Sequence, residues 1–223
     1  MSDPKSDPKK DLIEAAIGHV VFDGWSEATF KAAIADSGVE PAVARGIFPR
    51  GAIDLAVAFH KEGDAEMARR FAEEDKSEMG VTEKVTRAVQ LRFEAIPDKE
   101  AVRRGTTLFS LPQHAAEGAH LIWGTADAIW TALGDTSDDI NWYTKRATLS
   151  GVYSSTLLFW LGDDSLDGQA TWNFLDRRIE DVMRIEKVKK TVNDSQVLTA
   201  LTWGPRMLAS MVKAPKSADL PGG

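Results

Sequence analysis

Residues 24–51 read GWSEATFKAAIADSGVEPAVARGIFPRG, and this stretch contains the start and stop signals of two short helices. Ser26 is a preferred N-cap residue for the first helix, which carries an apolar face as far as Gly38. Pro41 is favoured in the first turn of the second helix, which ends at Phe48-Pro49. The tight turn between the two helices predicts a module with the shape of a helix-turn-helix.

This arrangement, followed by a long helix from Ala52, resembles the N-terminal module of TetR-type regulators over roughly the first 70 residues. A module that reads DNA needs an excess of basic side chains, because phosphate neutralisation supplies most of the affinity. The basic and acidic residues of the stretch are equal in number: Lys31, Arg45 and Arg50 against Glu27, Asp36 and Glu40. We therefore expect a scaffold that keeps the shape of the module and binds no nucleic acid. A TetR-type ligand-responsive transcriptional repressor is the alternative.

Apolar residues recur at helical spacing through the rest of the chain, and no alternating strand pattern is evident. The clearest stripes lie in residues 119–133, 142–161 and 172–183. The predicted fold class is all-α, a TetR-regulator-like helical fold with a C-terminal ligand-binding body. The expected parts are a disordered tail (1–9), the helix-turn-helix-like module (10–72), the helical body (79–186), a basic amphipathic segment (187–213) and a second disordered tail (214–223).

The composition is that of a folded globular protein, with 43% apolar and 27% charged residues in a chain of 223. The absence of cysteine excludes disulfides, thiolate metal sites and thiol nucleophiles. The polar residues 1–10 resemble neither a secretory signal nor a membrane anchor, and no apolar run reaches the roughly 18 residues that a membrane span needs. We expect a cytoplasmic protein of bacterial type, without a targeting segment, that touches membranes only peripherally.

Charge is unevenly distributed along the chain. The net charge is −7, yet Arg184 to Lys216 holds seven basic residues and two acidic ones. The remainder of the chain is therefore strongly acidic. A basic segment with an apolar face is suited to an anionic membrane surface, although a helix that packs in a dimer is an alternative reading of the same pattern.

Candidate catalytic groups are sparse. No histidine occurs in an H-E-x-x-H frame, and the single E-x-x-H pair, Glu117 to His120, lacks the second pair that a di-iron helical bundle requires. No P-loop, dinucleotide-binding or nucleophile-elbow motif occurs. We expect no enzyme activity, no catalytic residue, no metal and no cofactor.

The most specific motif lies in the second half of the chain, where residues 138–156 read DDINWYTKRATLSGVYSST and residues 171–179 read TWNFLDRRI. Together with Gly24-Trp25 and the turn at residues 48–52, this sequence resembles the COQ9 (Coq-nine) family of ubiquinone-biosynthesis accessory proteins. The resemblance covers most of residues 10–186.

The resemblance implies a TetR-like helical fold and an apolar pocket that binds lipid. It implies a protein that is not itself an enzyme and that assists the di-iron hydroxylase acting on demethoxyubiquinone. The implied partners are an isoprenoid lipid or phospholipid, this hydroxylase, a membrane surface and a second copy of the chain in a homodimer. The family's pocket arginine falls on Arg146, which would face a lipid head group, and its partner-binding patch falls on Asp139, Trp142 and Tyr143.

The residues themselves allow these roles. Trp142 and Tyr143 are separated by about 100° on a helix, so both cannot point into the centre of one core, and an exposed aromatic beside Asp139 is typical of an interface anchor. Arg146 would lie at the polar mouth of whatever the helix lines. An ion pair of Arg146 with Asp138 or Asp139 at the start of the helix explains this arginine equally well.

Two further groups of residues complete the expected sites. The first would line the lipid pocket, although each member could equally be plain core: Ile122, Ala126, Trp130, Leu149, Val152, Tyr153, Leu157, Leu175 and Ile179. The second would contact a membrane from the basic segment, where the family has a terminal amphipathic helix: Leu198, Leu201, Trp203, Met207, Leu208 and Met211.

Overall fold

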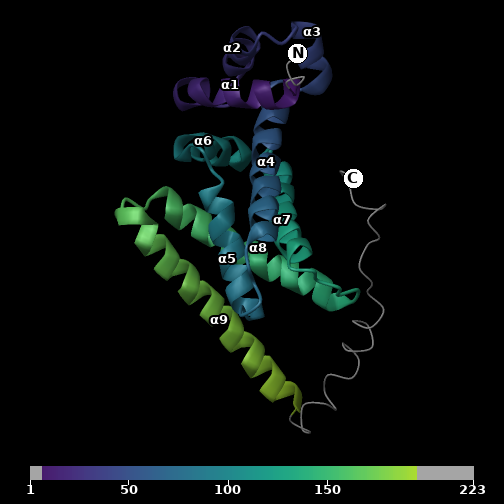
Figure 1. The fold of residues 1–223 in the computed structure, drawn as a ribbon, viewed down its shortest axis with the longest axis vertical. Coiled ribbons are helices and arrows are strands. Elements are labelled where there is room, and N and C mark those ends of the chain that lie inside the picture. Colours follow the sequence, from purple (N-terminus) through teal and green to yellow (C-terminus); the bar gives the residue numbers. More distant parts are fainter. Residues whose placement is uncertain (1–6, 195–223) are drawn as a thin grey trace. The chain divides into compact units, whose positions relative to one another are not determined.

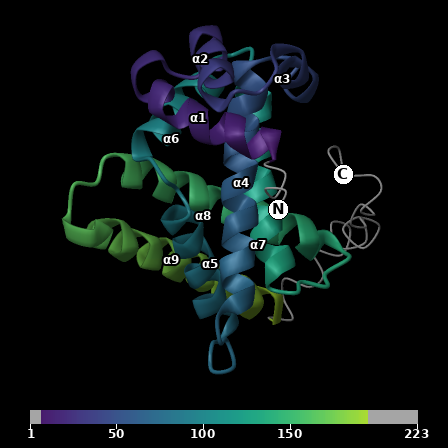
Figure 2. The ribbon, with the colours of Figure 1, turned by 45° about the horizontal axis from the view of Figure 1, so that its top comes forward.

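A computed structural model describes residues 7–194 of the chain, with side chains for residues 7–184. Every regular element within residues 7–194 is helical, so the all-α prediction is confirmed for that part of the chain. None of the helices in this range combines the length and apolar character that a membrane span requires. Figures 1 and 2 show the helices from two directions.

The chain folds into two compact units, and neither is a continuous stretch of sequence. Unit 1 combines residues 7–73 with 91–125, and unit 2 combines residues 74–90 with 126–194. The helices, in chain order, are α1 (Pro8–Asp23), α2 (Glu27–Ser37), α3 (Pro41–Ile47), α4 (Ala52–Glu73), α5 (Val81–Glu94), α6 (Lys99–Ser110), α7 (Ala115–Ala132), α8 (Ile140–Leu161), η1 (Leu166–Gly168) and α9 (Gln169–Asp194).

The predicted helix signals of unit 1 operate as expected. Gly24 ends α1 at a positive φ of 64°, and Gly38 ends α2 in the left-handed region, where glycine has no Cβ penalty. The hydroxyl of Ser26 accepts from the N–H of Thr29 and so caps α2. The expected disordered tail at residues 1–9 is too long, because α1 already begins at Pro8.

The α1–α3 module of unit 1 packs on a single apolar core. Trp25 closes one side of this core, where its indole N–H donates to the carbonyl of Ala101 in α6 at 3.0 Å. That bond joins residues far apart in sequence and places α6 in the same unit. The innermost side chains, all fully buried, are Leu12, Ala16, Val20, Phe30, Ala33, Ala44, Leu55 and Ala101.

Unit 2 contains a helical hairpin formed by α8 and α9, which lie beside each other in both views (Figures 1 and 2). The carboxylate of Asp139 caps α8 by accepting from the N–H of Asn141 at 2.8 Å. At the other end of α8, the Asp163 carboxylate accepts from the N–H and hydroxyl of Thr171 in the first turn of α9. These hydrogen bonds hold the pKa of Asp163 well below its usual range.

Candidate functional site

A half-open groove lies within unit 2, between α8, α9, the first turns of α5 and the end of α7. Its volume is about 240 Å³. The walls are mainly apolar, and the end nearest the start of α8 is polar. The apolar wall consists of Val81, Val85, Trp130, Leu149, Val152, Ile179, Val182 and Met183, and the polar end of Asn141, Thr144, Lys145 and Thr148.

The predicted pocket residues divide into two sets. Trp130, Leu149, Val152 and Ile179 line the groove. The others do not line it: Ala126, Tyr153, Leu157 and Leu175 are buried in the interior of unit 2, and Ile122 is half-buried in unit 1.

Sequence reasoning missed the contribution of α5 to the groove. The apolar face of α5 was visible in the spacing of Val85, Val89 and Phe93, but that spacing does not say which helix the face meets. Val182 and Met183 were recognised as part of a stripe and not as pocket residues. The rim is exposed, since Val81 is 64% and Met183 42% accessible.

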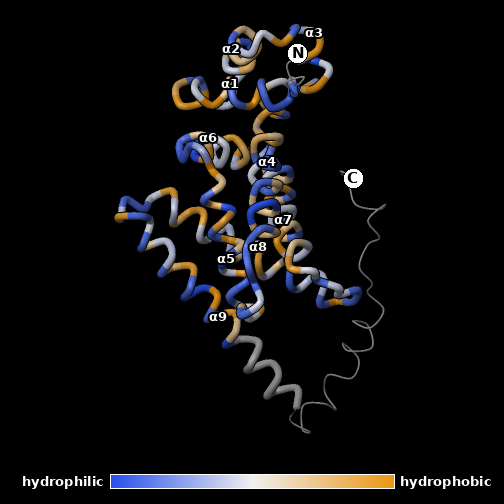
Figure 3. Tube along the Cα trace, in the orientation of Figure 1, coloured by the Kyte–Doolittle hydropathy of each residue, from blue (hydrophilic) through white to orange (hydrophobic). Residues whose placement is uncertain are grey.

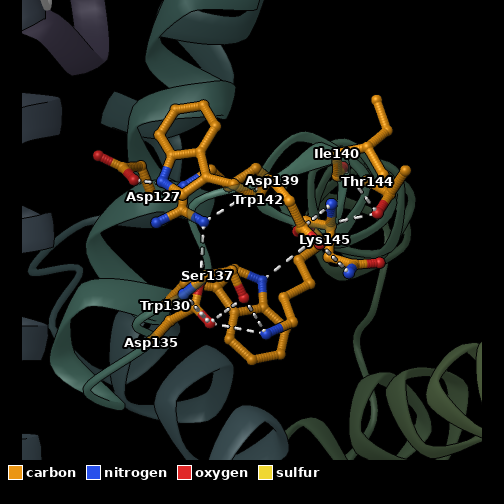
Figure 4. Close-up of polar contacts among 11 residues, drawn as sticks. Asp127, Trp130, Asp135, Ser137, Asp139, Ile140, Trp142, Thr144 and Lys145 are labelled. Carbon is orange, nitrogen blue, oxygen red and sulfur yellow. Dashed lines mark hydrogen bonds and ion pairs between the residues drawn. The ribbon is translucent and has the colours of Figure 1, made fainter. Parts of the chain in front are cut away.

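Arg146 does not face the groove. Its guanidinium is 3% exposed and lies between two carboxylates, with Nε donating to Asp127 at 2.5 Å and Nη1 to Asp135 at 3.0 Å (Figure 4). The predicted ion pair with Asp138 or Asp139 is not the one found, because the partners of Arg146 are Asp127 and Asp135. The contact with a lipid head group stays a prediction. The two partner carboxylates lie on α7 and in the following loop, whose path the sequence pattern did not predict.

Lys145, the preceding residue, lines the groove and shares Asp135 with Arg146. Its ammonium group donates to Asp135 at 2.6 Å and to Ser137 at 2.7 Å, and it lies 5.1 Å from the centre of the Trp130 ring (Figure 4). Burial of Asp135 opposes its charged form, but the bonds from Lys145, Arg146 and Ser137 prevail and lower its pKa to about 2.

The expected partner-binding residues occupy different environments. Trp142 is only 8% exposed, because the guanidinium of Arg146 covers its ring at 4.0 Å and the Tyr143 ring meets it edge-on at 4.8 Å. Of the two adjacent aromatic residues, Trp142 is therefore the one that packs in the interior. Tyr143 is half-buried and Asp139 is exposed, so both retain accessible surface.

Both arginines of residues 24–51 are engaged by carboxylates. Arg45 pairs with Glu27 and lies over the Phe30 ring. Arg50 donates to Asp54 and to Glu117, and these bonds raise its pKa above its usual range. These carboxylates reduce the positive charge available to phosphates.

Unit 1 also holds a buried polar cluster that the sequence did not reveal. Asp64 accepts from Arg92 at 2.6 Å and from Thr125 at 2.9 Å, and the His60 ring contacts the Thr125 hydroxyl at 2.8 Å. Desolvation, together with the nearby Arg92 charge, lowers the pKa of His60 to about 4. The groups come from α4, α5 and α7, whose packing no local pattern predicts.

The membrane-contacting residues expected between Leu198 and Met211 lie outside the described part of the chain. Among the side chains that the structure describes, no cluster of three or more potential ligands could hold a metal ion.

The arrangement of helices defines the class of protein. A crystal structure of a TetR transcriptional regulator from Nitrosomonas europaea ATCC 19718 is similar, with a TM-score of 0.64 and 18% identity, over 78% of this chain and 97% of that one. The chain has a TetR-like helical fold, as predicted. Residues 115–186 match the family model COQ9. This match assigns a similarity to the COQ9 family to that part of the chain.

Curated relatives support this assignment. The chain is 31% identical to "Ubiquinone biosynthesis protein COQ9, mitochondrial" of Rattus norvegicus, over 82% of this chain and 61% of that protein. It is 33% identical to the protein of the same name from Xenopus tropicalis, over 81% and 59%. It is 30% identical to the probable coq9 protein of Dictyostelium discoideum, over 86% and 65%. The chain thus spans about three fifths of the length of these relatives.

The relatives correct one expectation. Each is named a mitochondrial protein, which contradicts the prediction of a cytoplasmic, bacterial-type location. That prediction was based on the lack of an apolar secretory or anchoring run near residue 1. Mitochondrial targeting segments are amphipathic rather than apolar, so the polar character of residues 1–10 did not bear on this location.

Proposed function

We propose that this chain is a non-enzymatic, lipid-binding accessory protein of ubiquinone biosynthesis in mitochondria. In this proposal the unit 2 groove takes up an isoprenoid quinone precursor, or a phospholipid, and presents it to the demethoxyubiquinone hydroxylase. The observation that carries the proposal is the groove itself, which has apolar walls, a polar end and an exposed apolar rim. The names of the relatives supply the pathway.

The size of the groove limits what it can enclose. Pockets that bury a whole drug-sized ligand usually measure roughly 300–1,000 Å³. A groove of about 240 Å³ would cover a ring or a short isoprenoid stretch, while the rest of a polyprenyl chain continues past the rim. Partial enclosure suits a protein that transfers its ligand, because the part of the ligand outside the groove can contact a membrane or a partner protein.

The polar end suits an uncharged oxygen of the ligand. The charges of Lys145 and Arg146 are balanced by Asp127 and Asp135, so this end carries little net charge. An ammonium group has three N–H donors, and Lys145 uses two of them on Asp135 and Ser137. The third can donate to a quinone carbonyl, and Thr148 supplies a further hydroxyl to the groove lining.

Charges placed on the exposed rim test the groove without disturbing the core. The variants Val81→Glu and Met183→Glu should each weaken uptake of a short-chain ubiquinone about tenfold or more, because a carboxylate beside an apolar ligand loses hydration. Leu158→Glu and Leu166→Glu are matched controls, since both leucines are exposed in unit 2 outside the groove. Equilibrium dialysis measures the affinity.

Two outcomes would contradict the proposal. One is equal loss of affinity in the rim variants and the controls. The other is a purified protein that carries no lipid in native mass spectrometry and takes up none when a short-chain ubiquinone is supplied. Saturable, sequence-dependent DNA binding at low salt would instead favour the repressor. The homodimer, the hydroxylase partner and membrane contact through residues 187–213 are further predictions of this proposal.

A further inference from the structure

Unit 1 contains a half-open pocket of its own, between α1, α4 and the residues that follow α5. Its volume is about 280 Å³, and it shares no residue with the unit 2 groove. Apolar and charged residues alternate along α1 (Figure 3), and both kinds contribute to the lining. The apolar part of the wall consists of Ile13, Ile17, Phe59, Ala95, Ile96 and Pro97.

A buried cation forms part of the wall. The Arg92 side chain is 4% exposed, with Nε donating to Asp64 at 2.6 Å and Nη2 donating to the carbonyl of His60 at 3.0 Å. Gly63 also lines the pocket, and a Cβ at that position would lie 2.6 Å from Nη1 of Arg92. Glycine at position 63 therefore allows the guanidinium to lie against the backbone of α4.

Two of the three glutamates in the lining are neutralised by basic side chains. Glu62 pairs with Lys9 at 3.5 Å. Glu66 pairs with Arg69 at 2.8 Å and with Arg70 at 2.6 Å. These two carboxylates therefore add little net charge to the pocket.

The remaining charges of the lining also cancel. Arg92 is balanced by Asp64, and Lys10 and Glu14 lie one turn apart on α1 with opposite charges. Among the side chains of residues 7–184, neither Lys10 nor Glu14 has an ion-pair partner. A carboxylate in this pocket would lie near three glutamates, and an ammonium group would lie near Lys10 and Arg92. The pocket therefore favours a ligand without net charge.

The size and the walls suit a single aromatic ring with a short polar substituent. An apolar cavity of roughly 150 Å³ is sufficient to bind benzene. A pocket of about 280 Å³ has room for such a ring and for one polar group. Phe59 offers an aromatic contact, and a guanidinium such as that of Arg92 packs well on the face of a ring. The exposed side chains of Lys10 and Glu14 can bind the polar group.

We propose that this pocket is a second ligand site, which takes an uncharged compound with a single aromatic ring. The ring contacts Phe59 and Arg92, and the polar substituent lies toward Lys10 and Glu14. Residues of α1, α4 and the segment 95–97 surround the pocket only when unit 1 is folded, so the bound compound stabilises this unit by mass action. The site does not depend on the proposed lipid-binding function.

NMR of isoleucine methyl groups in the full-length protein locates the site. Ile13, Ile17 and Ile96 line the unit 1 pocket, and Ile179 lines the unit 2 groove. With benzyl alcohol as the probe, we expect saturable shifts and intermolecular nuclear Overhauser effects at the three unit 1 methyl groups, whether or not Ile179 responds. Effects at Ile179 alone, or at none of the four, would overturn the proposal.

Two charged probes of similar size test the electrostatic argument. Benzoate and benzylamine should each bind to the unit 1 pocket at least about tenfold more weakly than benzyl alcohol, because a charged group loses hydration there without gaining a partner. Equal or tighter binding of either charged probe would overturn the assignment of an uncharged ligand. A short-chain ubiquinone titrated in the same way tests the unit 2 groove, so a failure of the lipid proposal is seen separately at Ile179.

A variant that fills the pocket supplies a further test. Ala95→Trp should lower the affinity for benzyl alcohol at least about tenfold, because the indole occupies the space of the ring. Ala35→Trp is the matched control at an exposed position of α2 outside the pocket, and it should bind like the unsubstituted protein. Circular dichroism verifies folding, and the smaller Ala95→Leu replaces Ala95→Trp if that variant unfolds, with a several-fold loss expected. Equal affinities in the variants at positions 95 and 35 would overturn the site.

Discussion

Arg146 shows how one side chain can be conspicuous in the sequence for a reason that the sequence does not disclose. Its buried guanidinium contacts Asp127, Asp135 and the ring of Trp142. The sequence predicted a lipid head group, or Asp138 or Asp139, as the neighbour of this arginine. It could not predict the partners, because Asp135 reaches Arg146 only through the path of the loop between α7 and α8.

Removing this charge should destabilise unit 2 strongly. Arg146→Met would leave Asp135, whose side chain is 4% exposed, with less compensation, and we expect a loss of about 3–5 kcal/mol in the free energy of unfolding. Arg103→Met is the control, since Arg103 is exposed and its pair with Glu100 is worth at most about 1 kcal/mol. Urea titration measures both, and equal losses would contradict the buried role.

His60 makes the stability of unit 1 depend on pH. Its pKa is lowered from 6.5 to about 4 in the folded state, so the unfolded chain binds the proton more readily. Stability is therefore complete above pH 6.5 and declines as the pH falls toward 4, by at most about 3 kcal/mol. In the variant His60→Gln, the urea midpoint of unfolding should change less between pH 6.5 and pH 4 than in the unsubstituted protein.

An exposed histidine supplies the comparison for that profile. His120→Gln alters a side chain on the surface of α7, so it should reproduce the unsubstituted pH dependence. If the two variants gave the same profile between pH 6.5 and 4, burial of His60 would not be the cause of the pH dependence.

At the scale of elements, helix ends were predictable and helix partners were not. Ser26, Gly38 and Pro41 act through neighbouring backbone groups, so local sequence suffices to place the ends of α2 and α3. The groove wall from α5 and the burial of Trp142 depend on contacts between distant residues. An apolar stripe indicates that one face of a helix is buried, but it does not identify the helix that packs against this face.

Gly63 in the middle of α4 is a case in which packing overrides helix propensity. Alanine usually stabilises a helix interior by roughly 0.8–1 kcal/mol over glycine. Here a Cβ would lie 2.6 Å from Nη1 of Arg92, which is 4% exposed and bound to Asp64. Gly63→Ala should therefore lower the thermal midpoint of unfolding.

Gly151 on α8 is the matched control, because a Cβ there meets nothing within 4 Å. Gly151→Ala should raise the midpoint or leave it unchanged, as measured by circular dichroism. A higher thermal midpoint in both variants would contradict this explanation. It would show that the Arg92 side chain can move away from the added Cβ without loss of stability, so that packing does not require glycine at position 63.

On the scale of the whole molecule, the compact units depart from the linear division expected near residues 72–79. Residues 91–125 return to unit 1 after the chain has begun unit 2, so α5 and α7 each contribute to both units. Amphipathic periodicity depends only on residues that are close in sequence, so it does not indicate that residues 91–125 belong to unit 1. The all-α class was predictable because it needs only the sum of such local patterns.

The first 73 residues alone should therefore fail to fold cooperatively. That polypeptide contains Trp25 as its single tryptophan but lacks Ala101, whose carbonyl accepts the Trp25 indole proton. We expect red-shifted Trp25 emission and no sharp thermal transition. The polypeptide 1–125 carrying Trp123→Phe should restore blue-shifted emission, and a native-like shorter polypeptide would contradict this view of unit 1.

The late return of residues 91–125 has a consequence for synthesis. A nascent chain that has emerged to Glu73 must wait for a further 52 residues, up to Thr125, before unit 1 is complete. At about 5–20 residues per second this interval lasts roughly 3–10 s. During it the side of the unit 1 core that α6 covers, including the indole of Trp25, is exposed on the ribosome, and we expect it to be a substrate for a chaperone.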